Sequence, residues 1–163
     1  MSAKIEKLMK MYPEMVQERD CIAHQLAHFV GLTAEDVIES MYTPRMDGER
    51  VQTSNLSDKT AQIALVFRER QGIMNQQWFE SLEKRLNILN DEVVFLESAL
   101  RSLSGRLSEI MWDMVVECEK WAALEKKYNV SHSALYRLRQ KAIQELDRLY
   151  ESHSRTIRDF ILR

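Results

Sequence analysis

The sequence of 163 residues is poor in helix breakers and in cysteine, with four glycines, two prolines and two cysteines. Glycine and proline interrupt helices, so their scarcity predicts helix almost throughout a chain rich in Leu, Glu, Lys, Arg, Ala, Met and Gln. The two cysteines lie far apart and form no Cys-x-x-Cys pair, which excludes a disulfide scaffold and favours a reducing compartment. We therefore expect an all-α protein.

The chain also lacks a long apolar run. No stretch approaches the roughly 20 apolar residues that a membrane-spanning helix needs, and the amphipathic start has no apolar core of a signal peptide. With 45% apolar and 29% charged residues, the composition is typical of a folded chain rather than a disordered one. We expect a cytoplasmic protein without a membrane partner.

Negative charge is missing from one interval near the C-terminus. Residues 1–118 carry 13 basic and 19 acidic side chains, whereas residues 119–163 carry 10 and 6. No carboxylate lies between Glu125 and Glu145, and the cations in that interval are Lys126, Lys127, Arg137, Arg139 and Lys141. A local cationic excess in a slightly acidic protein favours a polyanion as partner.

The N-terminal region reads as a helix over residues 3–30. Tyr12 and Pro13 predict a break or kink, because proline disrupts a helix interior, and Gly31 is a plausible stop. The dominant apolar spacing of three and four residues makes this segment amphipathic. We expect it to pack against another helix.

A second group of signals follows Gly31. Thr33 with Asp36 resembles a capping box and predicts a short helix to about Tyr42. Residues 43–56 have no sustained period and read as loop. Ser57 is then expected to cap a helix that ends near Arg70.

A heptad repeat occupies the middle of the chain. Its apolar positions are Phe79, Leu82, Leu86, Leu89, Val93, Leu96, Leu100, Leu103, Leu107, Ile110 and Met114. This repeat predicts coiled-coil packing. Glu92 and Glu97 would oppose each other in a parallel dimer, which favours an antiparallel hairpin with the N-terminal helices or an antiparallel dimer. We read the glutamates beside the repeat as solvated, and expect Ser104 and Gly105 to interrupt the helix.

We accordingly expect an N-terminal helical hairpin or coiled-coil arm over residues 1–104 and a helix-turn-helix bundle over residues 105–163. Trp121, Leu124 and Tyr128 have the spacing of a first helix. The turn is Asn129-Val130-Ser131, with Val130 buried and Ser131 capping the next helix.

The second helix has an apolar and a polar side. The residues expected to face inward are Leu135, Leu138, Ala142, Ile143, Leu146 and Leu149. The opposite side suits the major groove, where arginine pairs with guanine and smaller polar groups adapt, while Lys126, Lys127, Arg139 and Lys141 hold phosphates. The expected DNA-binding residues are Lys126, Lys127, Ser131, His132, Ser133, Tyr136, Arg137, Arg139, Gln140 and Lys141. Four phosphate contacts per module predict a slope of log affinity against log salt near −3.6.

From about Leu107 to Leu149 the chain resembles region 4 of bacterial sigma factors, which reads an upstream promoter element. The matching positions are Ser131, Leu135 and Lys141-Ala142-Ile143. The resemblance assigns base reading to His132, Ser133, Tyr136 and Arg137, and phosphate holding to Lys141. Where this chain has His132 and Ser133 the family often has an arginine and an acidic side chain, so a different target sequence is expected. The segments that melt DNA in complete sigma factors are not evident.

A narrower resemblance spans more of the chain. It is similar to small sigma-like late-gene regulators of phages and prophages of Gram-positive bacteria, which join a helical pair to this module. Pro44, Asp47-Gly48 and residues 51–54 (VQTS) match the segment between their helices. The resemblance implies a transcription regulator in a bacterial or phage-infected cell, associated with the nucleoid. We expect double-stranded DNA as the partner, and we expect the arm to mediate self-association or contact with RNA polymerase. A dimer is favoured because one module gives a small interface.

Two other functions stay open at this point. A phage DNA-packaging recognition subunit, like a small terminase, would also join such a module to an oligomerising arm. A helical interaction module would bind RNA polymerase without DNA. No nucleophile and base are grouped, so we expect no enzyme and no cofactor. Cys21, His24 and His28 share a helix face but lack the fourth ligand of structural zinc, so no metal is expected.

Overall fold

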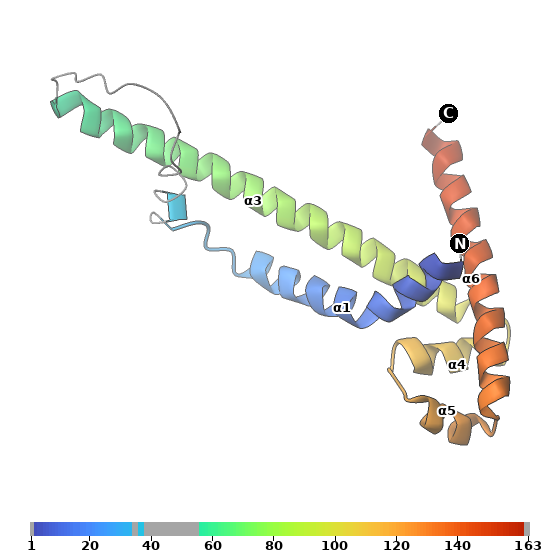
Figure 1. The fold of residues 1–163 in the computed structure, drawn as a ribbon. Coiled ribbons are helices and arrows are strands. Elements are labelled where there is room, and N and C mark those ends of the chain that lie inside the picture. Colours follow the sequence, from blue (N-terminus) through green and yellow to red (C-terminus); the bar gives the residue numbers. More distant parts are fainter. Residues whose placement is uncertain (1, 34–35, 38–55, 162–163) are drawn as a thin grey trace, which may run out of the picture. The chain divides into compact units, whose positions relative to one another are not determined.

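The structure, a computed structural model, describes the backbone of residues 2–33, 36–37 and 56–161, and the side-chain surroundings of residues 3–33, 36–37 and 66–155. The expected all-α class is confirmed, and these ranges contain no strand. The helices in Figure 1 are α1 (Ser2–Ala27), α3 (Leu56–Arg101), α4 (Arg106–Val115), α5 (Trp121–Tyr128) and α6 (His132–Ile161).

The chain divides into two compact units. Unit 1 consists of Met1–Cys21 and Asn87–Arg163, and unit 2 of Ile22–Leu86. Unit 1 thus joins the start of the chain to its C-terminal half. The expected division into a helical arm over residues 1–104 and a DNA-binding module over residues 105–163 stays a prediction.

Within unit 1, helix α1 runs through Pro13 without a break, so of the expected break or kink near Tyr12 and Pro13 the break is wrong. Proline removes one backbone hydrogen bond, but Met9, Tyr12 and Met15 are buried around it. The Tyr12 hydroxyl donates a 2.6 Å hydrogen bond to Glu97 Oε1 on α3. Burial, and then this bond, raise the pKa of Tyr12. Tertiary packing therefore holds the helix where the local sequence weakens it.

Within unit 2, the segment that follows α1 is held on α3 by hydrogen bonds of Leu32 to Asn75 and Gln71, here called the polar hook. Gly31 has φ +83°, and a Cβ added there would lie 2.8 Å from Asn75 Nδ2. The Leu32 amide donates to Asn75 Oδ1 at 2.7 Å, and Gln71 Nε2 donates to the Leu32 carbonyl at 3.0 Å. Gly31 is therefore required both by its backbone conformation and by the close approach of Asn75.

The capping box at Thr33 is confirmed. The Thr33 amide donates to Asp36 Oδ2 at 2.9 Å, and the Asp36 amide donates to Thr33 Oγ1 at 3.2 Å. The side-chain and then the backbone hydrogen bond from Thr33 lower the pKa of Asp36. The end of that short helix near Tyr42 and the expected loop up to residue 55 lie outside the described residues.

Helix α3 begins at Leu56 and continues to Arg101. The expected cap at Ser57 and end near Arg70 are wrong, because Ser57 lies inside the first turn and Gly72 is accommodated in the helix interior. A single glycine weakens a helix by about 1 kcal/mol, which does not end a long one. The expected interruption at Ser104 and Gly105 is confirmed, since α4 starts at residue 106 and Gly105 has φ +54°.

The heptad residues of unit 1 form its core, and those buried are Leu89, Val93, Leu96, Leu100, Leu103, Leu107 and Ile110. The reading of the flanking glutamates as solvated is corrected for two of them. Glu97 accepts from Tyr12, and Glu92 accepts a 3.3 Å bond from the Tyr150 hydroxyl on α6. Both glutamates thus bind other helices of the same unit.

Candidate nucleic-acid interface

Helices α4, α5 and α6 enclose a small apolar core within unit 1 (Figure 1). Each of the three helices contributes to it: Ile110 comes from α4, Leu124 and Tyr128 from α5, and Leu135 from α6, and all are buried. Arg106 Nη2 donates at 2.8 Å to the Tyr128 carbonyl, which satisfies one of the free carbonyls at the end of α5. The core fixes the direction in which α6 leaves the turn.

The turn between α5 and α6 spans residues 129–131. Asn129 adopts the left-handed conformation, with φ 50° and ψ 51°, which commonly ends a helix. Ser131 Oγ accepts from the Ala134 amide at 3.3 Å, so the expected cap is confirmed. Val130 is half-buried rather than buried. The first turn of α6 is thus fixed by its cap.

The inward face of α6 agrees with the expected apolar side at its centre. Leu135, Ala142, Ile143 and Leu146 are buried, whereas the expected inward residues Leu138 and Leu149 are only half-buried and form the border of that side. This burial leaves the opposite side of the helix at the surface.

The exposed face begins at the first residues of α6. His132, Ser133, Tyr136 and Arg137 are exposed, and Gln140 is half-buried. Arg137 Nε donates at 3.3 Å to the Ser133 carbonyl one turn earlier, so its guanidinium lies along the helix. Sequence reasoning missed Gln144, which is exposed and follows Ser133, Arg137 and Gln140 at helical spacing. The 3.6-residue period alone could have identified it.

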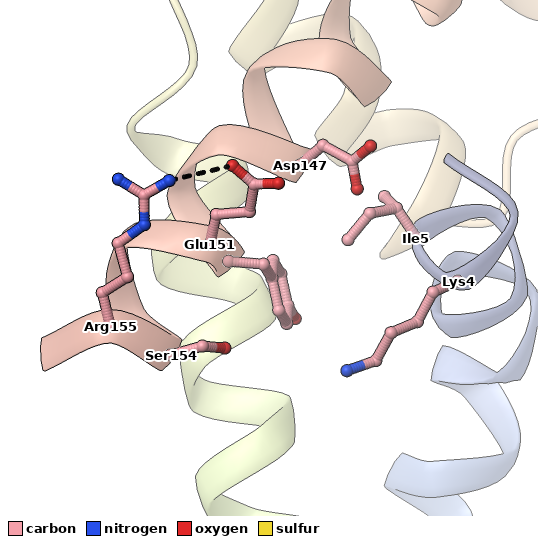
Figure 2. Close-up of a pocket in the computed structure, with 7 residues that line it drawn as sticks. Lys4, Ile5, Asp147, Glu151, Ser154 and Arg155 are labelled. Atoms are coloured by element: carbon pink, nitrogen blue, oxygen red, sulfur yellow. Dashed lines mark ion pairs between the residues drawn. The ribbon is translucent and has the colours of Figure 1, made fainter. Parts of the chain in front are cut away.

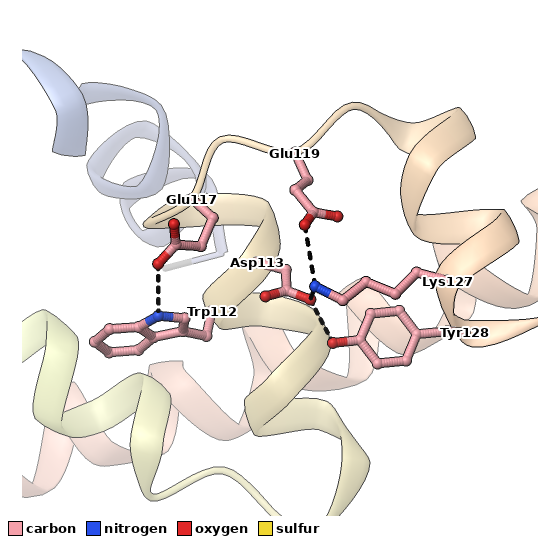
Figure 3. A network of polar contacts seen from close by, with 6 residues as sticks. All are labelled: Trp112, Asp113, Glu117, Glu119, Lys127 and Tyr128. Carbon is pink, nitrogen blue, oxygen red and sulfur yellow. Dashed lines mark hydrogen bonds and ion pairs between the residues drawn. The ribbon is translucent and has the colours of Figure 1, made fainter.

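Lys127 is held by a network between α4 and α5. Its Nζ lies 2.7 Å from Asp113 Oδ2 and 3.0 Å from Glu119 Oε1, as Figure 3 shows. Burial opposes ionisation of Asp113, but hydrogen bonds from Lys127 and Tyr128 outweigh it and lower the pKa of Asp113. Burial and the same carboxylate raise the pKa of Tyr128 to about 12. Lys127 therefore joins two helices and has intramolecular anionic partners.

Two more expected DNA-binding residues also have intramolecular partners. Arg139 is half-buried, and its Nη1 lies 3.4 Å from Glu6 Oε1 on α1. His132 Nδ1 lies 2.7 Å from Glu125 Oε1, and its ring centroid is 5.0 Å from that of Trp121. By contrast, Lys126 on α5 and Lys141 on α6 are exposed.

Among the described residues we searched for metal-binding clusters and for membrane-spanning helices. Those residues contain no group of three or more His, Cys, Asp or Glu side chains that could hold a metal ion. His24 and His28 instead stack with ring centroids 4.3 Å apart. None of the described helices has an apolar stretch long enough to traverse a bilayer.

Comparison of the chain with family models, with characterised proteins and with solved structures found no significant match.

Proposed function

We propose that this protein binds double-stranded DNA sequence-specifically through α5, the turn and the first half of α6. The observation that carries the proposal is the exposed start of α6, where Ser133, Tyr136 and Arg137 lie at the surface of an interval without carboxylates. A helix of this kind fits the major groove, and its cap and buried face hold it as a rigid unit.

The exposed residues divide by chemistry into base readers and phosphate holders. Arg137 suits guanine, and Ser133, Tyr136, Gln140 and Gln144 supply hydrogen-bonding edges. Lys126 and Lys141 suit phosphates, whereas Lys127 and Arg139 are engaged in ion pairs. With Lys126 and Lys141 as the phosphate holders of each module, the slope of log affinity against log salt should be about −1.8 per module rather than −3.6, and about twice that for a dimer.

We further propose that two copies associate through unit 2. The segment Ile22–Thr33 contains no Asp, Glu, Lys or Arg, and Val30 within it is 96% exposed. Beside it the Phe29 ring lies 5.1 Å from Trp78 and 5.3 Å from Phe79, both partly exposed. Interface cores are depleted of charge and enriched in aromatics, and a charge-free surface is electrostatically compatible with a second copy of itself.

Such a dimer would present two modules to two half-sites. Because the interface of a single module is small, the second module is expected to raise the affinity for DNA. In this proposal the protein is a transcription regulator of phage or prophage origin, and RNA polymerase is a further partner. Positioning on a promoter, and not catalysis, is its mechanism.

The test is a selection of bound sequences from random duplexes with the full chain. Against the selected duplex, Arg137→Ala should lose about 1–3 kcal/mol of discrimination, while Lys141→Ala should weaken all duplexes similarly. The matched control is Arg155→Ala, which removes an exposed arginine about 27 Å further along the same helix. Equal effects of the Arg137 and Arg155 substitutions would contradict the groove assignment.

The oligomeric state distinguishes the rival functions. Sedimentation should give a dimer that Val30→Asp converts to monomer, whereas Ile88→Asp, at an exposed apolar residue of unit 1, should leave the dimer intact. A ring of about eight copies would instead favour a DNA-packaging subunit. Binding to RNA polymerase without any duplex binding at low salt would favour a pure interaction module.

A further inference from the structure

Arg139 lies at the edge of the proposed DNA-binding face, yet a carboxylate from the other end of the sequence contacts it. It follows His132 by seven residues and Tyr136 by three, so all three lie on one side of α6. Its side chain is only 16% exposed, and its Nη1 lies 3.4 Å from Glu6 Oε1. The contact joins residues 133 positions apart, both within unit 1.

The first turns of α1 place Glu6 there through apolar anchors. Ile5 and Met9 are buried on either side of Glu6. Figure 2 shows Lys4 and Ile5 facing α6, where they line a pocket of about 250 Å³ together with Asp147 and Tyr150. Since the backbone around Glu6 is anchored, its carboxylate stays beside the recognition helix when α6 approaches a duplex.

We propose that Glu6 is an autoinhibitory residue that competes with a DNA phosphate for Arg139. This inference rests on the proposed function. A guanidinium that pairs with a carboxylate cannot give the same donors to a phosphate, and the carboxylate itself repels the duplex. The pair is a single contact of 3.4 Å and the Glu6 side chain is 33% exposed, so the pair is weak enough to break. Displacement of the start of α1, by a partner or by truncation, would then add one cationic contact to the DNA interface.

The experiment measures the salt dependence of binding to a mixed-sequence duplex by full-length variants. Glu6→Gln should bind more tightly than the wild type at low salt, and its slope should be steeper by about 0.9 for each module on the duplex, the value for one added phosphate contact. Glu14→Gln removes the same charge from an exposed position on the same helix, and it should leave the slope unchanged.

A second substitution makes the assignment specific to Arg139. In the wild-type background Arg139→Gln should hardly alter the slope, because Glu6 already occupies the guanidinium. In the Glu6→Gln background it should return the slope to the wild-type value. Melting curves and circular dichroism of each variant establish that unit 1 remains folded.

The outcomes separate the two proposals. Wild-type binding with equal slopes for Glu6→Gln and Glu14→Gln overturns the autoinhibitory contact and leaves the proposed function standing. The contact is also overturned if Arg139→Gln alone lowers the slope by about 0.9, because Arg139 would then already reach a phosphate. If no variant binds any duplex, both proposals fall.

Discussion

The heptad residues of helix α3 lie in both units, but the helix buries only those of unit 1. From Leu89 to Leu100 the heptad positions are buried, whereas no side chain between residues 66 and 86 is buried. In unit 1 the helix has covering partners, such as Tyr12 at Glu97 and the Tyr150 ring 4.7 Å from Phe95. In unit 2 a polar hook and a few aromatic contacts take their place.

A heptad repeat therefore identifies the side of a helix that is suited to packing, but it does not show whether the packing partner comes from the same chain. Unit 1 has a closed core that can hold helix α6 rigidly. Unit 2 leaves apolar surface available, which agrees with the proposed self-association. The two units thereby suit the two proposed tasks, binding DNA and binding a second copy.

The largest expected effect comes from truncating one heptad leucine in each unit. Leu96→Ala removes a fully buried side chain and should lower the free energy of unfolding by about 2–5 kcal/mol. The matched substitution Leu82→Ala, at a half-buried position of unit 2, should lower it by about 1 kcal/mol. Denaturant titrations measure both values. Equal losses would show that the two halves do not differ in packing.

Gly31 and Gly72 of unit 2 give the next effect, and substitutions at the two positions should act in opposite directions. Gly31→Ala introduces strain at a positive φ and displaces Asn75, so it should destabilise by about 1–2 kcal/mol. Gly72→Ala fills open space in a helix and should stabilise by about 0.5–1 kcal/mol.

Amide hydrogen exchange localises the first of these changes. Gly31→Ala should remove protection of the Leu32 amide, which donates to Asn75, while the amides around Leu96 keep theirs. Loss of protection in both units would mean that the polar hook is needed for the whole chain and not for unit 2 alone.

Much of the local structure was predictable because it depends on neighbouring residues. The all-α class, the Thr33–Asp36 box, the Ser131 cap and the break at Gly105 each follow from short-range chemistry. The continuity of α1 through Pro13 was not predictable in this way, because buried side chains around the proline hold that turn.

The candidate site shows the same limit. Exposure of Ser133, Tyr136 and Arg137 follows from the period of α6. The ion pairs of Lys127 and Arg139 arise from Asp113 and Glu6, which are distant in sequence, so a count of cations overestimated the free positive charge. Long-range pairing is the information that a single sequence does not contain.

The smallest expected effect is a pH dependence confined to unit 1. The Ser104 amide bonds Glu145 at 3.2 Å, and this bond with that of the Ser104 hydroxyl outweighs burial and lowers the pKa of Glu145. Because the folded-state value lies below the ordinary 4.5, the stabilisation is present above that pH and is lost as pH falls through the folded-state value.

Glu145→Gln should therefore lower stability at neutral pH and reduce the loss of stability as the pH falls below the ordinary pKa of 4.5. Asp20→Asn, at an exposed aspartate of α1, is the matched control. Parallel acid titrations of wild type and Glu145→Gln would contradict the role of the Ser104 contact.

The most direct test of the central claim is a titration of the full chain with its selected duplex and with a scrambled duplex of the same composition, at several salt concentrations. We expect the selected duplex to bind at least about 10³-fold more tightly, and both affinities to fall as salt rises. Equal affinity for the two duplexes, or no binding to either at low salt, would contradict sequence-specific recognition by α6.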